Sequence, residues 1–183
     1  FPYTTLFRSV AIGSYAGQYN QGSNAVAIGR EAGNSNQQES AIAIGDGAGQ
    51  YQSSCGIAIG LYAGSTQDEN AIAIGSYAGY NIQNSCTVAI GNYAGGDVQD
   101  IESVAIGDYA GVTQSSFAVA IGYYAGNTHQ YQGAVAIGSN AGSNNQGQFA
   151  VAIGAAAGAN NQSTCTIVLN ATGFELNTVQ ARS

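Results

Sequence analysis

The chain has 183 residues, of which 45% are hydrophobic and only 7% are charged, and its net charge is −7. Soluble domains usually carry about a quarter of charged residues. Nucleic acids and anionic membranes need clustered Lys and Arg, so the three Arg and absent Lys exclude both as partners. No segment predicts membrane insertion. The 27 glycines and low charge are typical of disordered chains, but strict repetition favours an ordered fold.

The first nine residues stand apart from the rest of the chain. Residues 1–9 contain the only Pro, break the pattern that follows, and resemble the translation of a sequencing-adapter oligonucleotide. The chain also has no Met. We therefore expect residues 1–9 to be an assembly artefact and the natural start to be missing.

From residue 10 onward the chain repeats one unit. The unit occurs ten times, from Val-Ala-Ile-Gly-Ser-Tyr-Ala-Gly (10–17) to Val-Ala-Ile-Gly-Ala-Ala-Ala-Gly (151–158). The spacing is 15 or 16 residues throughout, which indicates a fixed frame with one optional loop residue. A short fixed period predicts an all-β, single-chain parallel β-solenoid, or β-roll, of ten rungs over residues 10–173. At about 4.8 Å per rung the rod would be roughly 50 Å long.

We call the glycine that ends each Ala-Ile-Gly the central glycine of its rung. The segment before it alternates small and β-branched residues, which predicts a strand with two apolar faces. A coil of this length can cover only one face with its own interior, so the other face needs a second copy of the chain. We assign the Ile column to the core and expect the Ala column to approach the neighbouring copy; alternatively, Ala lies exposed as a small neutral residue. The assigned core residues are Ile28, Ile44, Ile59, Ile74, Ile90, Ile106, Ile121 and Ile137.

Two residues after the glycine, Tyr occurs in six rungs, and five of these follow one another as a Tyr stripe: Tyr62, Tyr77, Tyr93, Tyr109 and Tyr124. Neighbouring rings could stack with an offset. An aromatic stripe could bind a sugar or a surface. We favour a packing ladder, because Glu31, Gly47, Asn140 and Ala156 replace Tyr in other rungs.

One polar column never varies. Every rung has Gln eight residues before the next central position, and all length variation falls in the loop before it. Stacked amides can donate to and accept from their neighbours, so we predict a semi-buried, structural Gln ladder. Its members are Gln21, Gln37, Gln52, Gln67, Gln83, Gln99, Gln114, Gln130, Gln146 and Gln162.

Other reactive groups are sparse. Cys55, Cys86 and Cys165 share one column, and rungs two apart are too distant for a disulfide within the chain. They are possible interchain thiols or else free, partly buried ones. His129, the only histidine, is expected to be a solvated loop residue, and neither a metal site nor a cofactor is predicted.

Two glycosylation sequons, at Asn161 and Asn170, would matter only in a secreted eukaryotic protein. The pattern decays at Ile167–Leu169, which predicts a last, altered strand. Residues 174–183 would form a C-terminal cap or begin a further segment.

The unit Ser-Val-Ala-Ile-Gly-Asp-Tyr-Ala-Gly (103–111) resembles the head repeat of trimeric autotransporter adhesins, the YadA-like head, and related repeats of phage tail fibres and giant-virus fibre proteins. The resemblance implies a left-handed roll, three chains side by side, and an extracellular, cell-surface or virion-surface location. It further implies attachment to a host surface, matrix or glycan. The adhesin repeat usually has 14 residues, whereas this chain has 15–16 and an added Gln loop.

We therefore expect a structural or adhesive fibre protein whose main partner is itself, as a trimer or filament. The alternative is a ligand-binding solenoid for ice or carbohydrate, although no Thr column marks an ice-binding face. Short, nearly identical loops without clustered acids or bases argue against an enzyme.

Overall fold

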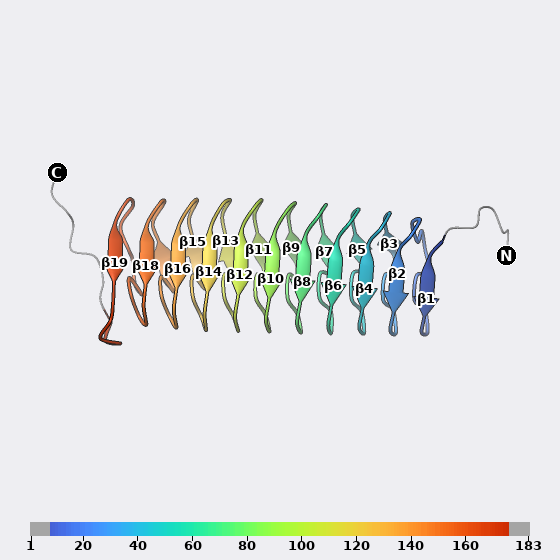
Figure 1. Ribbon diagram of the computed structural model, residues 1–183, viewed down its shortest axis with the longest axis horizontal. Helices are drawn as coiled ribbons and strands as arrows, with labels where there is room; N and C mark the ends of the chain where they lie inside the picture. The colour runs from blue at the N-terminus through green and yellow to red at the C-terminus, as the bar shows by residue number, and fades with distance from the viewer. Residues whose placement is uncertain (1–7, 176–183) are drawn as a thin grey trace.

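The computed structural model describes residues 8–175, which form a straight rod of stacked coils (Figure 1). Every strand pair is parallel, and the described residues contain no helix. The predicted all-β parallel solenoid is confirmed. The predicted artefact at residues 1–9 and the predicted cap at 174–183 lie largely outside the described residues.

One sheet runs the whole length of the rod. We call this eleven-stranded sheet A; in it Val or Ile pairs with Val or Ile, and Ala pairs with Ala, from one coil to the next. Only at the C-terminal edge does Ala152 pair with Val168. Its strands are β1 (Val10–Ile12), β2 (Val26–Ile28), β4 (Ile42–Ile44), β6 (Ile57–Ile59), β8 (Ile72–Ile74), β10 (Val88–Ile90), β12 (Val104–Ile106), β14 (Val119–Ile121), β16 (Val135–Ile137), β18 (Val151–Ile153) and β19 (Ile167–Leu169).

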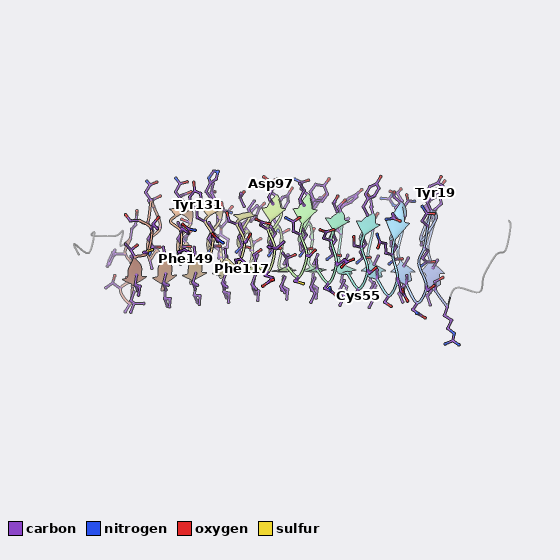
Figure 2. The ribbon with its side chains drawn as sticks, turned by 90° about the horizontal axis from the view of Figure 1, so that it is seen from above. Tyr19, Cys55, Asp97, Phe117, Tyr131 and Phe149 are labelled. Atoms are coloured by element: carbon purple, nitrogen blue, oxygen red, sulfur yellow. The ribbon has the colours of Figure 1, made fainter. Side chains whose placement is uncertain are left out.

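The opposite wall is sheet B, whose eight strands have two or three residues each and pair Gln with Gln throughout. Figure 2 shows sheet A along the lower side of the rod and sheet B along the upper side. The strands of sheet B are β3 (Asn36–Gln37), β5 (Tyr51–Gln52), β7 (Thr66–Gln67), β9 (Ile82–Gln83), β11 (Val98–Gln99), β13 (Thr113–Gln114), β15 (Thr128–Gln130) and β17 (Asn144–Gln146).

Two glycines per rung make the corner after sheet A possible. Gly75 has φ +132°, and a Cβ there would lie 2.4 Å from the carbonyl oxygen of Gly91 in the next rung. Gly79 has φ +54°, as expected for the second glycine, and a Cβ there would meet Oε1 of Gln83 at 2.5 Å. Both positions therefore need glycine for its backbone freedom and for its lack of a side chain.

The interior of the coil consists of alanine methyl groups and glutamine amides. Ala89, in the middle of β10, and Ala94, in the following corner, are fully buried, and the same holds for their counterparts from the second coil to the tenth. Gln99 reaches the same interior from sheet B and is also fully buried. A coil of 15 or 16 residues encloses too little space for larger apolar side chains.

The assignment of Ile to this core is wrong. In β10, Val88 and Ile90 point outward and are only half-buried, while Ala89 between them points inward. The two faces of the strand are therefore exchanged relative to the prediction. The corrected residues are Ile28, Ile44, Ile59, Ile74, Ile90, Ile106, Ile121 and Ile137.

The altered last strand is confirmed. β19 pairs with β18, and Asn170 stands where earlier rungs have glycine. The Asn170 side chain is 5% exposed; it donates to the carbonyls of Ala155 and Phe174 and accepts from the backbone and hydroxyl of Thr172. These contacts fold the chain back where the repeat stops.

Candidate interaction surfaces

The outer side of sheet A is an uninterrupted apolar surface, which we call the β-branched face. It consists of the first and third residue of each sheet A strand, and all of these are Val or Ile except Leu169. Each side chain is shielded by its neighbours one rung away, yet Ile74 and Ile137 remain 36% exposed and Ile153 40%. Along the lower side in Figure 2 these side chains form an even row. An exposed apolar stripe of this length indicates an interaction surface.

The Gln ladder is confirmed and is more buried than predicted. Nε2 of Gln99 donates to Oε1 of Gln114 at 3.3 Å, to the carbonyl of Val88 at 2.8 Å and to that of Ser103 at 3.2 Å. From Gln37 to Gln162 the ladder residues are at most 2% exposed. Because an unpaired buried amide group costs about 1–3 kcal/mol, the ladder holds the two sheets together in one register.

The Tyr stripe stacks as predicted. Ring centroids lie 5.2 Å apart between Tyr77 and Tyr93, 5.3 Å between Tyr93 and Tyr109, and 5.0 Å between Tyr109 and Tyr124. The rings cover each other's faces, so most of the stripe can offer only ring edges and hydroxyls to a ligand. This geometry agrees with a packing ladder.

The corner before each sheet A strand has a column with positive φ, which includes Cys55, Cys86 and Cys165. All three thiols are free and exposed, so the expectation of partly buried thiols is wrong. Phe117 (47% exposed) and Phe149 (54%) occupy the same column. Figure 2 shows Cys55, Phe117 and Phe149 along the corner that faces the viewer. This column forms one border of the β-branched face.

Ionisable groups form no reactive cluster in the described part of the chain. His129 is exposed in β15, and residues 8–175 hold no group of three or more His, Cys, Asp or Glu that could bind a metal. The Asp100 carboxylate accepts three hydrogen bonds. The donors are the Ser116 hydroxyl (2.8 Å), the Ile101 backbone N–H (2.8 Å) and the Asn84 side-chain amide (3.1 Å). The Ser116 bond is the main cause of a lowered pKa of Asp100, against the opposing effect of partial burial.

The two sequons differ in accessibility. Asn161 is exposed in a turn with φ +51°, whereas Asn170 is buried and uses its amide in four hydrogen bonds. The folded chain therefore leaves Asn161 as the accessible acceptor and does not offer Asn170 for modification.

Comparison with known proteins adds no relative. No protein-family profile, no curated protein and no solved structure matches this chain. Among residues 8–175 there is also no helix that is long and apolar enough to span a bilayer. The function must therefore be inferred from the surfaces described above.

Sequence reasoning missed the β-branched face itself. A usable signal was present, because the positions four and two before the central glycine and three after it are small in every rung. Three small columns facing one Gln column describe an interior that has no room for Val or Ile.

Proposed function

We propose that this protein is a structural or adhesive fibre protein, in which copies of the chain pack side by side through the β-branched face into a rigid extracellular or virion-surface rod. The observation that carries the proposal is the apolar outer side of sheet A, which is continuous over eleven strands. In water such a face favours burial, and a second identical rod offers the same spacing and chemistry.

Three parallel copies are compatible with this face. It has two columns of side chains, so around a threefold axis each copy can turn its Val-side column to one neighbour and its Ile-side column to the other. The resemblance to the heads of trimeric adhesins implies the same number of chains. Around a threefold axis, parallel copies bring equal rungs to the same height.

In this parallel register the two borders of the face would meet between copies. In a rotationally symmetric assembly, the corner before a strand in one copy lies beside the corner after that strand in the next copy. At two strands both borders carry exposed apolar residues: Cys55 and Leu61 flank β6, and Phe117 and Tyr123 flank β14. At β2, by contrast, the flanking residues are the polar pair Asn24 and Arg30. The match is not general, because Cys86 and Asn92 flank β10 and the two acids Glu102 and Asp108 flank β12.

The decisive experiment is a matched pair of charge substitutions. Ile74 on sheet A is 36% exposed, and Val98 on sheet B is 37% exposed. In analytical ultracentrifugation we expect the wild type and Val98→Lys to sediment as trimers. We expect Ile74→Lys to weaken association at least about 100-fold, or ~2.7 kcal/mol, because it buries an unpaired ammonium group.

Two results would contradict the proposal: a wild-type monomer at high concentration, or equal behaviour of the two variants. If the chain is monomeric and lowers the freezing point of water below its melting point, the ice-binding alternative takes its place.

A further inference from the structure

A second surface, separate from the β-branched face, has the features of a small-molecule site. On the sheet B side, three successive coils line a shallow, open groove of about 420 Å³. Its aromatic wall is Tyr131, which directly follows the ladder residue Gln130 and is 48% exposed. Figure 2 shows Tyr131 on the sheet B side of the rod.

The floor of the groove is backbone. In the coil after Tyr131, the equivalent position is Gly147, so no side chain fills the space beside the tyrosine ring. A Cβ on Gly147 would lie 2.5 Å from the backbone nitrogen of Thr164 and 2.7 Å from the carbonyl oxygen of Gln162. The glycine therefore permits close packing of two coils and keeps the hollow open.

Carboxamides line the rim. Asn145 donates to Oδ1 of Asn161 at 3.1 Å, and Gln148 donates to Oε1 of Gln132 at 2.8 Å. An amide offers two N–H donors and an oxygen with two lone pairs, so each pair keeps further donors and acceptors for a ligand. Asn161 Nδ2 donates to no group within residues 8–175.

The chemistry of this lining selects a ligand class. None of the eight residues that line the groove is charged, and the chain as a whole carries −7. Anionic ligands therefore meet no cation, and cations meet no carboxylate. A sugar ring has an apolar C–H side that can lie against a tyrosine face and hydroxyls that bond to amides. We propose that this groove binds a short neutral oligosaccharide.

A second hollow on the sheet B side allows a comparison with the Tyr131 groove. It measures about 220 Å³ and is lined by Tyr51 together with Asp68 and Ile82. An exposed tyrosine and several carboxamides are thus present in both hollows, and the Tyr131 groove differs in having no charged residue in its lining.

The test is titration of unglycosylated protein with triacetylchitotriose and maltotriose, followed by NMR of the tyrosine and amide resonances. Unglycosylated protein is required because a glycan on Asn161 would cover the groove. We expect binding of at least one of the two, at least tenfold weaker binding by Tyr131→Ala, and several-fold weaker binding by Asn161→Ala. Tyr19→Ala is the matched control, because Tyr19 is 58% exposed and does not line the groove. The anionic comparator is sialyllactose, which should not bind.

The groove is complete within one chain, so the Ile74→Lys variant should bind as the wild type does. The outcome therefore separates this inference from the proposed assembly. Absence of binding of both neutral sugars at 10 mM (about −2.7 kcal/mol as a limit on the binding free energy) would overturn the inference. Equal affinity of wild type and Tyr131→Ala would overturn it as well.

Discussion

The two outer faces of the rod have the same backbone and different chemistry. On sheet A every outward position is Val, Ile or Leu, whereas the position before the ladder glutamine on sheet B is Asn36, Tyr51, Thr66, Ile82 and Val98 in successive strands. Both faces are parallel, in register and built from the same repeat. Because only one face is uniform, something besides the fold must constrain its residues, and the proposed contact with another copy would supply such a constraint.

Cross-linking tests the comparison most directly. With Leu61→Cys, the new thiol of one copy should lie beside Cys55 of the next, so mild oxidation should convert most of the protein into a covalent multimer whose mass counts the chains. Non-reducing gel electrophoresis measures it. Leu61→Cys combined with Cys55→Ser is the control and should remain uncross-linked. An antiparallel arrangement would leave the first variant uncross-linked too.

The next largest expected effect is a difference in stability between substitutions on the inward and outward sides of β11. Gln99→Ala leaves the carbonyls of Val88 and Ser103 and the amides of Gln83 and Gln114 without their partner. We expect a loss of about 4 kcal/mol in the free energy of unfolding. Val98→Ala, on the outward side of the same strand, should cost less than about 1 kcal/mol. Urea denaturation of the Ile74→Lys background, followed by circular dichroism, compares them, and similar losses would refute a structural ladder.

In sheet A the two sides of β10 offer a similar contrast. Ala89→Leu forces a large side chain into an interior of methyl groups and amides, and we expect a loss of about 3 kcal/mol. Ile90→Leu keeps the volume of an outward residue and should cost under about 1.5 kcal/mol. Thermal melting of the same background checks both, and a larger effect at Ile90 would mean that the faces are assigned wrongly.

The smallest expected effect is the pH-dependent contribution of Asp100 to the stability of the fold. Because the folded-state pKa of Asp100 is lowered from 3.8, its stabilising effect is complete above that value and is lost as the pH falls through the folded pKa. Asp100→Asn should therefore destabilise at pH 7 by less than about 1 kcal/mol, and the difference from wild type should shrink below pH 4. Asp68→Asn is the control, since Asp68 follows the ladder in the same column and accepts a single 3.4 Å bond from the Ser85 side chain. A pH-independent difference would exclude this linkage.

Much of this architecture could be predicted from the sequence, because a repeat compares itself with its own copies. The period, the strand position, the stacked tyrosines at Tyr77 and Tyr93 and the ladder through Gln99 all follow from columns that recur. The side to which Ile90 points does not follow from alternation, because a period of two is satisfied by either face. Only the volume of the interior decides between Ala89 and Ile90, and that volume depends on how far apart the two sheets lie.

The Tyr131 groove lay beyond prediction for the opposite reason. It depends on Tyr131, Gly147 and Asn161, which depart from their columns or vary within them. A repeat analysis treats such departures as loop variation, so only a three-dimensional arrangement reveals that they meet.

The ladder of amides also gives the rod a direction. Nine successive glutamines donate Nε2 to the Oε1 of the following one, from Gln21 to Gln162, and none points back. The amide dipoles therefore add along the axis instead of cancelling. Turning one amide over would set two oxygens against each other on one side and two N–H groups on the other, so orientation is inherited from neighbour to neighbour. A rod of nearly identical rungs thus has two electrically unlike ends, and a rung joining either end meets a different partner.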